Sequence, residues 1–191
     1  MGRAAVFLDR DGVINRSEVR DGKPYSPRAL DDFRLLPGSV AAIDRLKQAG
    51  YLVVVVTNQP DIGNGFVARE VVEAMHRRLR ERTLVDDVRM CPHSQGAGCD
   101  CRKPRPGMLL ALVKDWQIDP ASSWMVGDRG SDIVAGEAAG CRTIFIDRGY
   151  REPKPAAPTM VARTLPEAVE AILGHQRERA PATPSTVRRR Q

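Results

Sequence analysis

The sequence predicts an α/β fold, a Rossmann-like, doubly wound parallel sheet with helices on both of its faces. Three observations lead to this prediction. Short apolar runs alternate with segments of helical periodicity along most of the chain. The runs at residues 4–8 and 52–56 are apolar without alternation, as in strands that are buried on both faces. Polar motifs follow several of these runs, at the position where open parallel sheets bind ligands.

The same pattern sets the order of the elements. Strands are expected over residues 4–8, 52–56, 88–90, 123–126, 143–146 and 160–162. Helices are expected over residues 39–48, 67–84, 107–116, 131–139 and 165–173, where apolar residues recur at helical spacing. Residues 16–36 and 60–65 are rich in turn-forming residues and are expected to be loops. Because strands alternate with helices, right-handed crossovers and a parallel sheet follow.

The length and charge of the chain indicate one domain with a basic tail. The 191 residues suffice for a full-sized core, which we expect over residues 1–173. The net charge of +6 comes largely from residues 174–191, which leaves 25 basic and 23 acidic residues, a net charge of +2, in residues 1–173. Segment 174–191 is poor in apolar residues and is expected to be disordered. With few aromatic residues for base stacking, a nucleic-acid partner is not expected.

Neither a membrane-spanning apolar run nor a signal peptide is visible, so we expect a cytoplasmic protein without membrane contact.

Three of the four cysteines fall within eleven residues. In a chain without a secretion signal, such clustering favours metal binding over a disulfide framework. Cys141 stands apart and is expected to be a small core residue.

Two aspartates, Asp9 and Asp11, follow the first apolar run. Because successive strand residues point to opposite faces, we expect these carboxylates to share a side and Arg10 to point away. Asp128 follows a later strand, and the carboxyl ends of parallel strands meet at one edge of a sheet. Three carboxylates around one point favour a hard cation, and Mg²⁺ binds carboxylate and phosphate oxygens together. Taken alone, the first motif is equally typical of an Asx-type turn.

Thr57 and Lys103 add the groups that a phosphate would need. Thr57 follows the second apolar run and offers a hydroxyl and nearby backbone amides to phosphate oxygens. Lys103 adds a positive charge at the end of the cysteine-rich loop. An aspartate nucleophile, a cation, a hydroxyl and a lysine are together what phosphoryl transfer through an aspartyl-phosphate requires.

A second group of ligands lies in the loop at residues 91–103. Two pairs, each with one residue between its members, are separated by a five-residue spacer: Cys91 and His93, then Cys99 and Cys101. Three cysteines and one histidine are a common structural zinc set, and four protein ligands leave no position open for water. We therefore expect a structural Zn²⁺ that staples this loop and fixes the residues that follow it, Arg102 and Lys103.

Four motifs resemble those of the haloacid dehalogenase (HAD) superfamily of phosphatases, in the same order and spacing. They are Asp9-Arg10-Asp11-Gly12-Val13, Thr57-Asn58-Gln59, Lys103-Pro104 and Gly127-Asp128-Arg129-Gly130-Ser131-Asp132. The resemblance implies that Asp9 is the nucleophile, and that Asp11 begins as a protonated acid and then activates water. It implies that Thr57 and Lys103 hold the phosphoryl group, and that Mg²⁺ is bound by Asp9, the backbone carbonyl of Asp11, and Asp128. Asp132 is expected either to orient Lys103 or to interact with the dipole of a helix start.

The zinc loop narrows the resemblance to two capless branches, the heptose bisphosphate phosphatases and the histidinol-phosphate phosphatases. The segment Pro104-Arg105-Pro106-Gly107-Met108 is more similar to the heptose branch. That branch implies removal of the C7 phosphate of D-glycero-D-manno-heptose 1,7-bisphosphate, in bacterial surface-glycan precursor synthesis, by a monomer. The residues implied in binding the sugar phosphate are Asn58, Gln59, Arg102 and Arg129.

Residues 60–65 depart from the heptose branch, which usually has Ser-Gly-Ile-Ala-Arg-Gly there. This chain has Pro60-Asp61-Ile62-Gly63-Asn64-Gly65, with an added acid and no arginine. A histidinol-phosphate phosphatase is therefore the alternative, with Asp61 or Glu18 as the partner of the substrate amine. A nucleic-acid 3′-phosphatase and a non-enzymatic zinc module are less favoured. The near-neutral body argues against the first, and the convergence of three carboxylates argues against the second.

Overall fold

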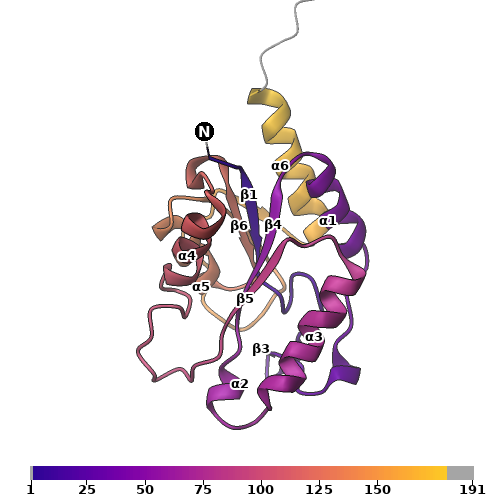
Figure 1. Ribbon diagram of the computed structural model, residues 1–191, viewed down its shortest axis with the longest axis vertical. Helices are drawn as coiled ribbons and strands as arrows, with labels where there is room; N and C mark the ends of the chain where they lie inside the picture. Colours follow the sequence, from indigo (N-terminus) through magenta and orange to yellow (C-terminus); the bar gives the residue numbers. More distant parts are fainter. Residues whose placement is uncertain (1, 180–191) are drawn as a thin grey trace, which may run out of the picture.

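The computed structural model describes residues 2–179, and a six-stranded sheet forms its centre (Figure 1). The strands lie in the order β5-β4-β1-β6-β7-β8, and every neighbouring pair is parallel. The predicted α/β fold with a doubly wound parallel sheet is thereby confirmed. The strands are β1 (Ala5–Leu8), β4 (Leu52–Asn58), β5 (Asp87–Cys91), β6 (Trp124–Gly127), β7 (Arg142–Ile146) and β8 (Met160–Ala162).

Helices cover both faces of this sheet, α1 and α6 on one side and α4 and α5 on the other (Figure 1). Within β1, Val6 and Leu8 pack into the core under α1, α3 and α6, whereas Ala5 and Phe7 pack into the core under α4 and α5. Because neither face is left to water, the central strands are continuous apolar runs. The helices are α1 (Ser39–Gln48), α3 (Arg69–Arg82), α4 (Gly107–Trp116), α5 (Gly130–Ala138) and α6 (Leu165–Arg179), with a 3-10 turn η2 (Pro120–Ser122) before β6.

The central position of β1 determines where the site lies. Leu8, the last residue of β1, is paired with Val55 of β4 on one side and Val126 of β6 on the other. All three strands run in the same direction, so the residues that follow them meet at one edge of the sheet. This is the edge at which the motifs of the sequence were expected to converge.

Residues 16–36, expected to be a loop, contain a small antiparallel hairpin of β2 (Glu18–Arg20) and β3 (Lys23–Tyr25), followed by a 3-10 turn η1 (Leu30–Asp32). Asp21 and Gly22 form the turn with φ of 50° and 76°, a geometry that the Asp-Gly dipeptide favours. The hairpin escaped prediction because its strands are short and mostly exposed, so they carry no apolar alternation. The loop expected at residues 60–65 likewise contains a short helix, α2 (Pro60–Gly63).

The last helix, α6, continues past its predicted end at residue 173 and into the segment predicted to be a disordered tail. His175 explains this extension, because its ring packs edge-on against Trp124 with the ring centroids 5.4 Å apart. Residues 180–191, the rest of the predicted tail, lie outside the described residues. Within residues 2–179, no helix is both long and apolar enough to cross a membrane.

Candidate functional site

Asp9 and Lys103 form the buried centre of this edge. Asp9 follows the end of β1, and its Oδ1 accepts a hydrogen bond of 2.7 Å from Lys103 Nζ. The same ammonium group donates to the backbone oxygen of Val56 at 2.6 Å and lies 2.7 Å from Asp132 Oδ1. Burial alone would lower the pKa of Lys103, but the charges of Asp132 and Asp9 outweigh burial and raise that pKa. Lys103 is therefore a fixed positive charge within the site.

Two further side chains hold Lys103 in place. Asn58 binds its backbone twice, because Asn58 Nδ2 donates to the Lys103 oxygen at 3.0 Å and Asn58 Oδ1 accepts from the Lys103 N–H at 3.2 Å. The two carboxylate oxygens of Asp132 have different partners. Oδ1 faces Lys103, and Oδ2 accepts a hydrogen bond of 3.0 Å from the Arg129 N–H at the start of α5. Asp132 thus contacts Lys103 and also caps the start of α5, so its position agrees with both expectations.

Asp128 follows β6, and its buried carboxylate forms no ion pair within residues 2–179, although the Tyr150 hydroxyl faces it as a hydrogen-bond donor. Burial raises the pKa of Asp128, and the charges of Asp9 and Asp132 raise it further. Asp9, Asp128 and Asp132 each offer an oxygen that lies within 4.8 Å of the others. A buried carboxylate without a cation beside it is costly, and a divalent cation would supply the partner it lacks. The donor set therefore fits Mg²⁺.

Gly12 lets Asp128 approach the loop after β1. A Cβ atom at Gly12 would lie 1.7 Å from Asp128 Oδ2, and the backbone φ of +82° also disfavours any other residue. The pKa of Asp9 is also shifted. Burial and the neighbouring carboxylates raise it to about 7, while Lys103 acts in the opposite direction. A cation beside Asp9 would favour its ionised form.

Asp11 lies in a different environment. The prediction that Arg10 points away from it is wrong, since Arg10 Nη2 donates to both oxygens of Asp11 at 3.0 Å. Strand alternation no longer applies there, because β1 has ended before Arg10. Burial would raise the pKa of Asp11, but the charge of Arg10 and hydrogen bonds from Arg10, Asn15 and Ser26 lower it. The structure therefore holds Asp11 ionised, where a protonated acid was expected.

Gln59 connects Asp11 with Thr57. Its Nε2 donates to Asp11 Oδ2 and to Thr57 Oγ1, both at 2.8 Å. The side chains of Gln59 and Thr57 are both buried, and neither lines the cavity described below. The structure thus places Gln59 between two predicted catalytic side chains, while its direct contact with substrate stays a prediction.

A cavity of about 570 Å³ opens at this edge of the sheet. Part of its wall comes from the β2–β3 hairpin, through Lys23 and Tyr25, and another part from Asp61 of α2. The structure therefore brings the predicted motifs together in one concave site, although they come from distant parts of the sequence. The predicted site residues on the wall are Asp9, Asp11, Asn58, Arg102, Lys103, Asp128 and Arg129.

The two predicted substrate-binding arginines differ in their pairing. Arg129 forms a two-point ion pair with Glu152, in which the Nε to Oε2 distance is 2.9 Å. Arg102 has a buried Nη1 with no hydrogen-bond partner in the described part of the chain. An unpaired guanidinium nitrogen at a cavity wall is suited to an anionic group of a ligand.

The two predicted partners of a substrate amine are both paired already. Asp61, the added acid of residues 60–65, lies 2.7 Å from Arg28 Nε. Glu18 lies 2.6 Å from Arg20 on the exposed hairpin. A carboxylate that already has a cation beside it is a weaker site for a second cation.

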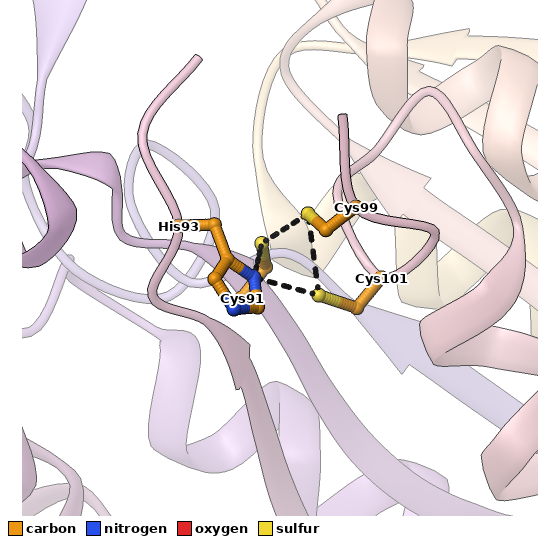
Figure 2. A group of neighbouring side chains, drawn as sticks. All are labelled: Cys91, His93, Cys99 and Cys101. Carbon is orange, nitrogen blue, oxygen red and sulfur yellow. Dashed lines mark hydrogen bonds between the residues drawn. The ribbon is translucent and has the colours of Figure 1, made fainter. Parts of the chain in front are cut away.

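The four predicted zinc ligands face one another at the end of β5 (Figure 2). Cys91 Sγ lies 3.5 Å from both His93 Nδ1 and Cys99 Sγ, and Cys101 Sγ lies 3.3 Å from His93 Nδ1 and 3.5 Å from Cys99 Sγ. Ligands at about 2.3 Å from a tetrahedral zinc are about 3.8 Å apart, which is close to these separations. The Cys/His cluster therefore fits a zinc site with all four positions filled by protein.

The chain is similar in sequence to known hydrolases. A HAD-hydrolase-like family model matches residues 100–168. The D-glycero-beta-D-manno-heptose-1,7-bisphosphate 7-phosphatase of Pseudomonas aeruginosa is 42% identical over 154 residues, which cover 78% of this chain and 84% of the relative. The protein of the same name from Pasteurella multocida is 39% identical and covers 77% of this chain and 83% of the relative. The chain belongs to the HAD-like hydrolase family.

A solved structure of a HAD-like hydrolase has the same fold. The D,D-heptose 1,7-bisphosphate phosphatase of Bordetella bronchiseptica, complexed with magnesium and phosphate, matches with a TM-score of 0.74 and 32% identity. The match covers 90% of this chain and 99% of that chain. These relatives confirm the predicted resemblance to the heptose bisphosphate branch of the HAD phosphatases.

Sequence analysis missed several residues that support the site of this HAD-like hydrolase. Asn15 Nδ2 and Ser26 Oγ each donate to Asp11 at 2.8 Å, and Glu152 holds Arg129. Asn15 is four residues from Asp11 and could have been found from turn chemistry. The other two had no local signal, because their positions depend on how the hairpin and the loop after β7 fold onto the site.

Proposed function

We propose that this protein is a Mg²⁺-dependent phosphatase that removes the C7 phosphate of D-glycero-D-manno-heptose 1,7-bisphosphate through an aspartyl-phosphate on Asp9. The observation that carries the chemistry is the buried Asp9–Lys103 pair beside the buried Asp128 carboxylate, which forms no ion pair within the described part of the chain. The names of the relatives and the Cys/His loop support the choice of sugar.

In the proposed reaction, an Asp9 oxygen attacks phosphorus and the bond from phosphorus to the sugar oxygen breaks. Lys103 and the hydroxyl of Thr57 bind the oxygens of the phosphoryl group during transfer. Asp9, Asp128 and the backbone carbonyl of Asp11 would hold Mg²⁺, which when bound supplies positive charge opposite the phosphoryl oxygens. Water then attacks phosphorus, its proton passes to Asp11, and the Asp9 carboxylate leaves to free inorganic phosphate.

The ionised state of Asp11 suits the second step better than the first. As a carboxylate held by Arg10, Asn15 and Ser26, Asp11 can accept a proton from the attacking water. To protonate the leaving sugar oxygen, it must first take up a proton. Entry of the anionic substrate favours that uptake, because negative charge beside a carboxyl group raises its pKa.

The cavity supports a substrate with two phosphates. Its volume of about 570 Å³ lies within the range of small-molecule sites. If one phosphate meets Asp9 and Lys103, the cations on the wall that are left for the other are Arg102, whose Nη1 has no partner in the described residues, and Lys23, since Arg129 is already paired with Glu152. Histidinol phosphate has one phosphate and an amine, and Asp61 and Glu18 are already paired with arginines. Because these two carboxylates already have cationic partners, the site favours a heptose bisphosphate over histidinol phosphate as the substrate.

The test is phosphate release from both anomers of the heptose 1,7-bisphosphate and from histidinol phosphate, with Mg²⁺ present. We expect the highest kcat/KM for a heptose bisphosphate, the β anomer first because the relatives are named for it. The matched control is Asp9→Asn, which keeps the volume but removes the nucleophile, and should lower kcat on the order of 10⁴-fold. A higher kcat/KM for histidinol phosphate, or an active Asp9→Asn variant, would contradict the proposal.

A further inference from the structure

Arg10 is a fully buried cation that the proposed reaction does not use directly. Its exposed fraction is 0%. Its Nε and Nη2 donate to the Asp11 carboxylate at 3.0 to 3.1 Å, and its guanidinium lies 5.6 Å from the centre of the Phe33 ring. A buried guanidinium is costly unless its donors are satisfied, so its remaining nitrogen also needs an acceptor.

His76, in the middle of α3, is that acceptor. Arg10 Nη1 and His76 Nε2 are 3.0 Å apart, and both side chains are buried. A guanidinium has only donors, so the imidazole accepts the hydrogen bond, is neutral, and carries its proton on Nδ1. His76 and Asp11 therefore hold Arg10 from two sides.

We propose that His76 is a positioning residue, which fixes the Arg10 guanidinium so that Arg10 holds the Asp11 carboxylate in the orientation used to activate water. The assignment rests on the proposed function. Asn15, Ser26 and Gln59 also donate to Asp11, but in the described part of the chain Arg10 is the one cation among its hydrogen-bond donors. A two-point pair with a planar guanidinium constrains the carboxylate more than single hydrogen bonds do.

The two chemical steps differ in their need for Asp11, which makes the proposal testable. With p-nitrophenyl phosphate, the nitrophenolate leaves as an anion when Asp9 attacks, so that bond breaks without a proton from Asp11. Hydrolysis of the aspartyl-phosphate still needs Asp11 to take a proton from water. Loss of orientation at Asp11 should therefore slow the second step and leave the first nearly unchanged.

The experiment compares His76→Leu, which removes the acceptor, with His76→Gln, whose side-chain oxygen can accept from Arg10. Leu79→Val is the control, because Leu79 is a buried residue of the same helix whose side chain packs into the core, and the substitution keeps its backbone oxygen, which accepts from Thr83 Oγ1. Nitrophenolate release is followed before and during steady state by rapid mixing, with folding checked by circular dichroism.

For His76→Leu, we expect a burst approaching one nitrophenolate per enzyme, followed by a steady state slower by between about tenfold and a hundredfold. His76→Gln should recover most of the rate, and Leu79→Val should match the wild type. Equal slowing of both phases in His76→Leu, or no recovery in His76→Gln, would overturn the inference. If the wild type hydrolyses the nitrophenyl ester but no heptose bisphosphate, the proposed substrate fails and this test still stands. If neither p-nitrophenyl phosphate nor a heptose bisphosphate is hydrolysed, both the proposed function and the role of His76 are wrong.

Discussion

Asp9 and Asp11 are two residues apart, yet their carboxyl groups have pKa values shifted in opposite directions. Burial raises the pKa of Asp9, and Lys103 only partly opposes this. Around Asp11, Arg10 and the neighbouring hydrogen-bond donors outweigh burial and lower the pKa. The difference arises because Arg10 turns toward only one of its two neighbours. At the residue scale, the direction of one buried arginine gives different pKa values to the proposed nucleophile, Asp9, and the proposed base, Asp11.

The pH dependence of folding should report the environment of His76. Burial, with the nearby charge of Arg10, lowers the pKa of His76 from 6.5 to about 3. Between those values the unfolded chain binds the extra proton, so the free energy of unfolding falls as the pH falls. From pH 7 to pH 5, the wild type should lose about 2 kcal/mol relative to His76→Gln, which does not titrate. Urea unfolding at both pH values measures this, and parallel losses in the two proteins would contradict it.

At the scale of elements, loop 91–103 and β4 together hold Lys103, which we propose to bind the phosphoryl group. Lys103 comes two residues after Cys101, the last ligand of the Cys/His cluster, and Asn58 at the end of β4 binds its backbone. The loop contains Gly96 and Gly98, and Cys91 is its one fully buried zinc ligand. Because the loop has so little core of its own, we propose that a bound zinc holds its shape.

Removal of zinc should therefore lower activity through Lys103. We expect Cys101→Ser to lose bound zinc, to expose loop 91–103 to proteolysis, and to lower kcat/KM on the order of tenfold or more. The same substitution at Cys141, which lies in the core under α4 and α5, should keep the zinc and the activity. Zinc content, limited proteolysis and phosphate release are the measurements. A zinc-free, fully active enzyme would refute this role for the loop.

At the scale of the whole molecule, α6 closes one of the two cores. It packs along α1, where Arg45 pairs with Glu170, and its last described turns bring His175 against Trp124 of β6. We propose that the described residues form one domain, which extends past residue 173 at least as far as His175. The sequence predicted that the domain ends at residue 173, because residues 174–191 are poor in apolar residues and contain two prolines.

Two truncations distinguish these boundaries. A chain that ends at residue 179 should keep the melting temperature and activity of the full chain. A chain that ends at residue 173 loses the contact between His175 and Trp124, which is worth about 1 kcal/mol. Its melting temperature should fall by roughly 2–4 °C. Calorimetry measures both melting temperatures. If the two truncated chains melt at the same temperature, the domain ends at residue 173 as the sequence predicted.

The sheet could be predicted because its signals are local. A strand buried on both faces is a continuous apolar run, and β1 and β4 are such runs. The hairpin and α2 could not be found in this way, because their strands and helix bury few apolar residues. The hairpin is determined by its Asp-Gly turn and by contacts with distant residues, such as the hydrogen bond of 2.8 Å from the Arg151 N–H to the Gly22 oxygen, and only the turn is visible in a sequence.

The sequence by itself determined the chemistry that the site can hold. Parallel strands bring their carboxyl ends together, so Asp9, Thr57 and Asp128 converge wherever such a sheet forms, and the spacing of the Cys/His ligands defines a zinc site. Only the tertiary structure decided the charge states of the site carboxylates and the partners of the buried charged side chains. Arg10 meets a histidine 66 residues away, and Asp61 meets an arginine 33 residues away. Such pairs depend on how helices and loops pack over the sheet, and no periodicity in the sequence records that packing.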